Sequence, residues 1–319
     1  MSERTATRRN VLKATGAALG AATLPSVASA STNDSEWTDV ESPVGGTLYD
    51  VEQTTAGAYA VGDSGVVLER TGEGWQTILD GGPTGNGNNL YGAGATDDGE
   101  RLWFVGSSGA IGEYDVTTGN LNDHSAPMDV TNNFNDVSVT GEAGEANVYV
   151  AGDSGKMYYS FENGAGQTWD YVTPGSGSNI NAVDFYDDRK GHIVDGNKSV
   201  FRTQDGSTWD RIGLADANVN FHGVDSDGAD DVRVSGGGGM VFHWDGVEWT
   251  PSDTGDAGLR DVEVEGGDGL TVGGGGKVYA LEDGEWKQQT TPTGQNLKAV
   301  LRESDPETAV GAGGTIIEH

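Results

Sequence analysis

The sequence contains no cysteine, and this absence removes several kinds of site at once. Without thiols, a disulfide, a zinc–thiolate centre, an iron–sulfur cluster and a cysteine nucleophile are all excluded. Basic residues are also scarce, because 18 Lys and Arg stand against 50 Asp and Glu, for a formal net charge of −32. Nucleic acids and anionic lipid surfaces both bind basic faces, so neither is an expected partner.

Long apolar runs and helical periodicity are missing after the first thirty residues. The glycine clusters are not followed by a helix, so they do not form phosphate cradles. No metal-ligand spacing links the histidines, which are His124, His192, His222, His243 and His319. What the chain has instead is 53 Gly and 25 aromatic residues (8 Trp, 10 Tyr and 7 Phe) spread along its 319 positions, which is typical of a folded, turn-rich domain.

The first thirty residues have the order of parts found in an export signal. Arg8-Arg9 precedes a modestly apolar stretch from Ala14 to Leu24, and Ala28-Ser29-Ala30 offers small residues for cleavage. We therefore predict a twin-arginine signal peptide over residues 1–30. The mature chain, a single domain over 31–319, would be extracellular or at the cell surface and would not be inserted in the membrane.

Removing that signal makes the charge more extreme. The segment holds four basic residues and one acidic residue, so the net charge becomes −35. Acidity spread over the whole chain resembles that of proteins from salt-loving archaea, where molar salt screens the self-repulsion over about 3 Å. We expect an exported haloarchaeal protein, most simply a monomer.

One unit repeats seven times after the signal: an apolar strand start, a second strand that ends in glycine, a tight turn, a third strand, and a turn that closes on tryptophan. Six of the seven second strands would end at Gly62, Gly106, Gly152, Gly196, Gly236 and Gly273, and the last at Gly311. These glycines are 37 to 46 residues apart, which is the spacing of four-stranded propeller blades. The expected fold is an all-β, seven-bladed propeller of antiparallel blades.

The two ends of the repeat region complement each other. Residues 315–319 form a third strand with no fourth, and residues 36–38 form a fourth strand with nothing before it. Pairing the N-terminal strand with the C-terminal blade would close the ring and leave no open edge. Blade two lacks the tryptophan that starts the fourth strand, and residues 115–121 are expected to replace it.

The unit Val-Gly-x-x-Gly followed by Asp-Gly-x-x-Trp resembles the BNR and Asp-box repeats of sialidase-like propellers. It is more similar to the photosystem II assembly factor (Ycf48-like) propellers, within the broad WD40/YVTN-like class. The likeness covers roughly residues 36–319, and the best Asp box, Thr203 to Trp209, is one residue short of the family form. In the family that box stabilises a turn. The resemblance implies a scaffold role without a known client.

Sialidase chemistry, as the same resemblance describes it, needs three arginines that grip a carboxylate. Eight Arg remain after residue 30, and only Arg260 occupies a strand-start position next to the central channel. A three-arginine clamp is therefore not expected.

The second residue of each strand start changes its chemistry while the repeat keeps its backbone, so we predict a ligand-binding ring at the channel mouth. Its members are Tyr49, Tyr91, Asn135, Asn181, His222, Arg260 and Lys298. The last three form a local cationic arc suited to an anionic ligand. Ordinary solvated channel residues are the alternative. The third position is always small: Asp50, Gly92, Asp136, Ala182, Gly223, Asp261 or Ala299.

Two further features stay open, a Ca²⁺ site and N-glycosylation. Residues 225–231 are dense in carboxylates, and Ca²⁺ binding there is the competing interpretation of an acidic loop between the first and second strands, although the EF-hand order is absent. Asn197 and Asn33 each begin an N-glycosylation motif, and Asn197 is expected at an exposed hairpin turn.

Two functions of different classes follow. The first is an exported, non-catalytic propeller that binds a protein or glycan, with no resident cofactor. The alternative is a carbohydrate-active enzyme, a sialidase-like glycosidase or a lyase, that uses acids at the channel mouth. Such an enzyme would place two carboxylates roughly 5–10 Å apart, and the acids near the axis are Asp50, Asp136 and Asp261.

Overall fold

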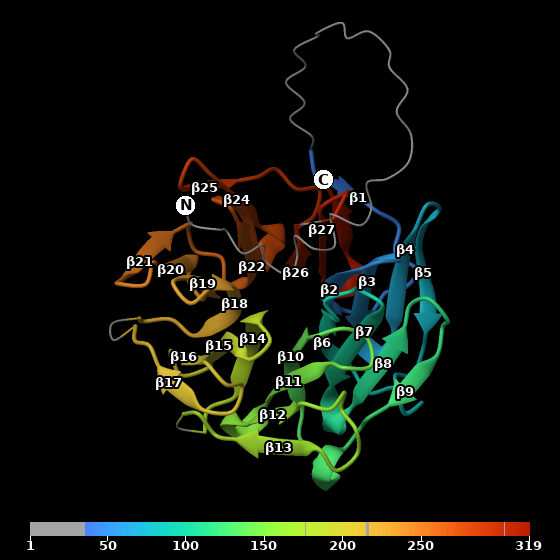
Figure 1. Cartoon of the computed structure of the whole chain (residues 1–319). Helices are drawn as coiled ribbons and strands as arrows, with labels where there is room; N and C mark the ends of the chain where they lie inside the picture. The colour runs from blue at the N-terminus through green and yellow to red at the C-terminus, as the bar shows by residue number, and fades with distance from the viewer. Residues whose placement is uncertain (1–35, 176, 215–216, 303) are drawn as a thin grey trace, which may run out of the picture.

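The computed structural model describes residues 36–319 except 176, 215–216 and 303. The predicted signal peptide and the Asn33 motif lie outside the described residues. The 28 strands form seven four-stranded antiparallel sheets arranged around a central axis (Figure 1). The seven-bladed propeller predicted from the repeats is therefore confirmed.

Six blades use their four strands in chain order from the axis outwards, and blade seven does so for its first three strands. The first strands lie next to the axis, where those of neighbouring blades contact one another. The first strands are β2 (Leu48–Thr54), β6 (Leu90–Ala95), β10 (Phe134–Thr140), β14 (Ile180–Asp187), β18 (Phe221–Gly228), β22 (Leu259–Glu265) and β26 (Leu297–Leu301). The second strands are β3 (Gly57–Gly62), β7 (Arg101–Gly106), β11 (Asn147–Gly152), β15 (Lys190–Asp195), β19 (Asp231–Gly236), β23 (Asp268–Gly273) and β27 (Thr308–Gly311).

The outer half of each blade is more variable in length. The third strands are β4 (Val67–Thr71), β8 (Ile111–Asp115), β12 (Met157–Ser160), β16 (Val200–Thr203), β20 (Met240–Trp244), β24 (Val278–Glu282) and β28 (Ile316–Glu318). The fourth strands are β5 (Gly74–Leu79), β9 (Leu121–Asp123), β13 (Trp169–Val172), β17 (Trp209–Arg211), β21 (Trp249–Asp253), β25 (Glu285–Gln288) and β1 (Thr38–Asp39). In blade two the fourth strand begins at Leu121, at the end of the segment expected to replace the missing tryptophan.

The ring closes through the two ends of the described chain. β1 pairs antiparallel with β28, so blade seven is assembled from both (Figure 1). Glu318 of β28 reaches into blade one, where its carboxylate accepts hydrogen bonds from Arg70 Nε at 2.7 Å and Trp75 Nε1 at 2.9 Å. The expected closure is therefore present, and a buried carboxylate reinforces it.

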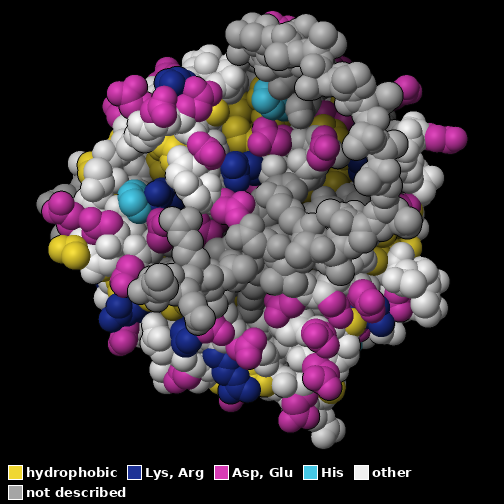
Figure 2. Space-filling model, turned by 45° about the horizontal axis from the view of Figure 1, so that its top comes forward, with side chains coloured by type: hydrophobic (Ala, Val, Ile, Leu, Met, Phe, Trp, Pro, Cys, Tyr) yellow, Lys and Arg dark blue, Asp and Glu magenta, His cyan; other side chains and the backbone are white. Residues whose placement is uncertain are grey.

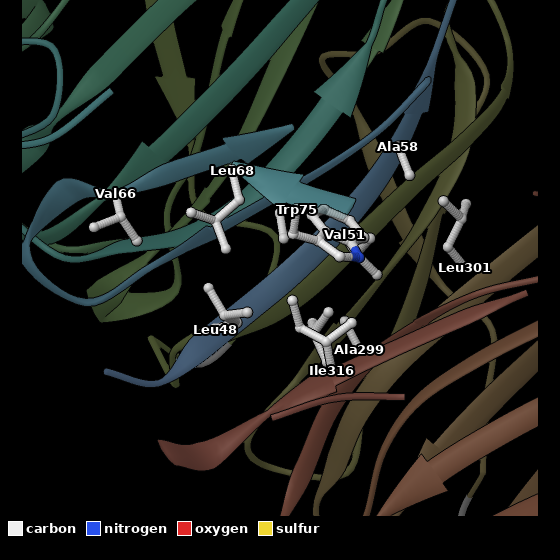
Figure 3. Packing of buried hydrophobic residues seen from close by; sticks show 11 residues of the cluster. Leu48, Val51, Ala58, Val66, Leu68, Trp75, Ala299, Leu301 and Ile316 are labelled. Atoms are coloured by element: carbon white, nitrogen blue, oxygen red, sulfur yellow. The ribbon is translucent and has the colours of Figure 1, made fainter. Parts of the chain in front are cut away.

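The apolar core lies between blades rather than in one centre. Leu48, Val51 and Leu68 of blade one pack against Ala299 and Ile316 of blade seven (Figure 3). Similar clusters fill the other interfaces, since apolar side chains of twisted sheets interlock face to face. Within residues 36–319 and apart from the gaps, no helix has the length and hydropathy to cross a membrane.

Glycine recurs at the end of the second strand because two backbones approach closely there. A Cβ at Gly106 would lie 1.9 Å from the carbonyl oxygen of Asn89, and one at Gly311 would lie 2.3 Å from that of Asn296. Both glycines have extended φ angles, so the requirement is space rather than a left-handed backbone. In blade four the strand ends at Asp195, one residue before Gly196.

Four strand starts are preceded by an asparagine whose side chain bonds to another blade. Asn89 Oδ1 accepts the N–H of Ser64, and Asn133 Oδ1 accepts that of Ser108. Asn179 and Asn296 repeat the pattern with Ser154 and Gly275. Each side chain thus joins its own blade to the turn of the preceding blade.

Candidate functional site

All seven predicted ring residues occupy one backbone position, the extra residue of a β-bulge. In every blade the register between the first and second strands skips the second residue of the strand start. A bulged residue is left out of the ladder, and bulges commonly redirect a side chain at the edge of a site. This explains why the repeat keeps its backbone here while the side chain varies.

The structure brings the three basic ring residues together. Arg260 Nη1 lies 3.4 Å from His222 Nδ1, and Arg260 is exposed. Burial, followed by the charges of Arg260 and Lys298, lowers the pKa of His222 to about 4. Burial and then Arg260 also lower the pKa of Lys298, against an opposing effect of Asp63. We call His222, Arg260 and Lys298 the rim cluster.

The next two members of the ring form an aromatic pair. The rings of Tyr49 and Tyr91 meet edge to face with centroids 5.0 Å apart. Tyr49 donates its hydroxyl to Asp63 Oδ1 at 3.1 Å, and burial, with this bond second, raises the pKa of Tyr49 to about 12. Lys298 Nζ lies 5.9 Å from the centroid of the Tyr49 ring, so the aromatic pair continues directly from the rim cluster.

The two asparagines of the ring hold blades together. Asn135 Nδ2 donates to the carbonyl oxygen of Ile180 at 3.0 Å, and Asn181 Nδ2 donates to that of Phe221 at 2.6 Å. Each bond crosses to the following blade. The predicted ring therefore divides into two parts. The rim cluster and the aromatic pair make five neighbouring residues, and the other two are amides that bond to the following blade.

The third position of the strand start, next to the ring residue, carries an acid in three blades. Asp50 Oδ2 accepts the N–H of Ala93 at 2.7 Å, and Asp136 Oδ2 accepts that of Val183 at 2.8 Å. The same bond joins Asp261 Oδ2 to the Val300 N–H. In all three, Oδ1 accepts the N–H of the next residue in the chain. These acids tie each first strand to the first strand of the following blade.

The fifth position of the strand carries a second tier of acids that the sequence interpretation missed. Asp184 accepts the N–H of Ser226, Asp225 accepts that of Val264, and Glu263 accepts that of Arg302. The sequence signal that could have found these acids is their spacing of two residues from the third position, because alternate residues of a strand share a face. The prediction of an acidic loop that begins at Asp225 is wrong, because β18 continues to Gly228 and Asp225 is buried.

A cavity of about 160 Å³ occupies the channel from the third position onwards. Carboxylates dominate its lining: Asp50, Glu52, Asp97, Asp136, Asp184, Asp225, Asp227, Asp261 and Glu263. Within the described chain, none of the seven ring residues lines it. Burial, and then the neighbouring acids Asp136 and Asp261, raise the pKa of Asp50 well above its ordinary value. Burial is also the main cause that raises the pKa of Asp136 to about 8.

Acidic side chains are spread over the molecular surface as well (Figure 2). Among the residues that the structure describes, no group of three or more His, Asp and Glu has an arrangement that could hold a metal ion. The Asp box behaves as a turn, since Asp205 Oδ1 accepts the N–H groups of Ser207 and Thr208. Asn197 is exposed in the turn between β15 and β16, and its glycosylation stays a prediction.

Comparisons with known proteins support the architecture. No family model matches the sequence, and no curated protein sequence matches it. Ycf48 from Cyanidioschyzon merolae has a similar structure, with a TM-score of 0.70, 17% identity and coverage of 89% of this chain and 98% of that one. A structure of Ycf48 bound to D1 peptide gives a TM-score of 0.71 at 14% identity and covers 93% and 99%.

A third similar structure belongs to an enzyme. It is a catalytically inactive variant of virginiamycin B lyase from Staphylococcus aureus with quinupristin, with a TM-score of 0.76, 11% identity and coverage of 89% and 98%. At these identities the likeness shows a shared propeller fold. The chemistry must be argued from the residues of this chain.

Proposed function

We propose that this protein is an exported, non-catalytic propeller that serves as a binding or assembly scaffold at the cell surface. In this proposal the rim cluster holds an acidic segment of a partner protein, and the aromatic pair contacts the apolar or planar groups beside the acid. The twin-arginine leader expected over residues 1–30 supports export, and the acidic composition supports a salt-rich setting.

One observation carries the proposal: three basic side chains lie together without an acidic partner in a strongly acidic chain. Within the described residues, none of His222, Arg260 and Lys298 forms an ion pair with a carboxylate at 4 Å or less, whereas Arg70, Arg101 and Arg233 all do. Adjacent like charges destabilise a fold unless something else favours them. An anionic ligand would supply the missing partner.

We favour a protein ligand over a glycan because Ycf48, a propeller of similar shape, has a structure bound to D1 peptide. The acids next to the axis support a non-catalytic role. Both carboxylate oxygens of Asp50 and of Asp136 already accept backbone N–H groups. These bonds give both acids a structural task between or within blades that a non-catalytic propeller would also need.

The alternative function is a carbohydrate-active enzyme that uses those acids. The raised pKa of Asp136, about 8, is its supporting observation, because catalytic acids often have such values. Hydrolysis or elimination of an acidic glycan by the purified protein, lost in Asp136→Asn, would establish this alternative and overturn the scaffold proposal.

The scaffold proposal is tested with a fluorescent acidic peptide and an array of acidic glycans, measured by anisotropy at fixed KCl. We expect peptide binding that Arg260→Ala with Lys298→Ala weakens at least tenfold. Lys198→Ala with Lys277→Ala removes the same charge elsewhere on the surface and is the matched control. Equal loss in both pairs, or unchanged affinity in the rim pair, would contradict the proposal, and glycan binding alone would reassign the ligand.

A further inference from the structure

The crowding of the rim cluster has a consequence for ligand binding. His222 projects from β18, Arg260 from β22 and Lys298 from β26, so three successive blades each contribute one basic group. Because a guanidinium has no acceptor, the contact of 3.4 Å requires His222 Nδ1 to accept from Arg260 Nη1. The imidazole is then neutral, and its remaining proton is on Nε2.

The charged groups around His222 have one sign. Arg260 and Lys298 act on it from blades six and seven, while on the side of blade four the matching ring residue is the neutral Asn181. Asp63 acts on Lys298 and bonds to Tyr49. The free site therefore consists of two cations and a neutral imidazole.

We propose that the rim cluster binds an oxyanion together with one proton, which His222 takes up from solvent as the anion arrives. The step forms one N–H bond at Nδ1 of His222, and the displaced Arg260 donor turns to the anion. This inference rests on the proposed function, because it describes how the same site would hold its acidic partner.

The physical reason is a reversal of the local field. In the free protein, burial first and then the charges of Arg260 and Lys298 disfavour a proton on His222, which agrees with its pKa of about 4. An oxyanion next to these cations offsets their repulsion and favours protonated His222, which can donate a third hydrogen bond to the anion. By linkage, the site must bind the anion more tightly as the pH falls between the two pKa values of His222, free and bound.

The size of the effect follows from the two pKa values. If the anion restores His222 to its ordinary pKa of 6.5 from about 4, affinity rises about tenfold from pH 7.5 to pH 5.5. Protonation of the channel acids would act in the same direction, but none of the three rim residues lines that cavity, and a variant of His222 alone separates the two contributions.

The experiment uses the full chain and a peptide carrying one sulfotyrosine, whose sulfate ester stays ionised over this pH range. Calorimetry in two buffers of different ionisation enthalpy measures both affinity and proton uptake. We expect the tenfold gain and uptake of up to one proton in the wild-type protein. His222→Gln should bind with a pH dependence below twofold, while the control His243→Gln should keep the full dependence. Circular dichroism at each pH checks that every variant is folded.

The outcomes separate the two proposals. Absence of binding at every pH would overturn the anion site and with it the proposed function. Binding without proton uptake, or a pH dependence that survives in His222→Gln, would overturn proton coupling and leave the anion site standing. A phosphoserine peptide and an all-carboxylate peptide identify the kind of oxyanion, and tighter binding of either changes only the source of the group.

Discussion

The rim cluster and the channel acids sit one residue apart on the same strands, yet they differ in charge and in task. Arg260 occupies a bulge, is exposed and has a basic neighbour on either side. Asp261, the next residue, accepts two backbone N–H groups and joins blade six to blade seven. A bulged residue is released from the ladder, whereas its neighbour faces the crowded axis.

The difference teaches where this fold can vary. At the third position, a Cβ added to Gly92 would lie 2.6 Å from Cα of Asp136, so only small residues fit. Carboxylates are accepted there because they bond to backbone amides that otherwise lack a partner. At the second position the bulge leaves room for side chains of any size, and except at Asn135 and Asn181, which bond to the following blade, we expect the side chain to be replaceable without loss of the fold.

The largest effect is expected in the channel. Asp136→Ala leaves the N–H groups of Val137 and Val183 without their acceptor, which should lower the free energy of unfolding by about 2–3 kcal/mol. Urea denaturation measures this change. Asp256→Ala, at an exposed acid, is the control and should change it by less than about 0.5 kcal/mol. Similar values for the two variants would show that the channel bonds contribute little.

The next largest effect is the pH dependence of the free energy of unfolding, which we expect the channel acids to produce. The pKa of Asp136 is about 8 in the fold against an ordinary 3.8, so the folded state binds a proton that the unfolded state releases. Stability should therefore rise as the pH falls from about 8 towards 4, by up to about 1.4 kcal/mol per pH unit. Asp136→Asn should flatten this slope in thermal melts, and an unchanged slope would contradict the assignment.

The smallest effect on folding is expected at the rim. Arg260→Ala removes an exposed cation that repels its neighbours, so stability should change by less than about 0.5 kcal/mol in either direction. Urea denaturation beside the peptide-binding assay tests the contrast, because binding should fall while folding does not. A loss of more than about 1 kcal/mol would mean that the rim, like the channel, is structural.

Much of the fold was predictable from local patterns. All seven strand starts, from Leu48 to Leu297, begin where the repeat placed them, because alternation of apolar residues and turn glycines is a short-range signal. The pairing of β1 with β28 followed from counting strands. The extra length of β18 was not predicted, since Asp225 and Asp227 have the composition of a loop, and the strand there depends on pairing with β19 and on contact with blade six.

The site was predictable in part. Variation at the second position identified the rim cluster and the aromatic pair, but it gave Asn135 and Asn181 the same weight. Their amides are used by carbonyl groups about forty residues away, on the following blade. No local pattern contains that information.

By itself, the sequence determined the seven repeats, the small residues at the axis and the cationic arc in an acidic chain, because each depends on spacing along one strand. The tertiary structure decided which polar groups are bonded within the protein and which remain open to the ligand that we propose. It did so because neighbouring blades supply the partners: backbone amides for Asp50 and Asp136, a carbonyl group for Asn181, and, among the described residues, the basic Arg260 for His222.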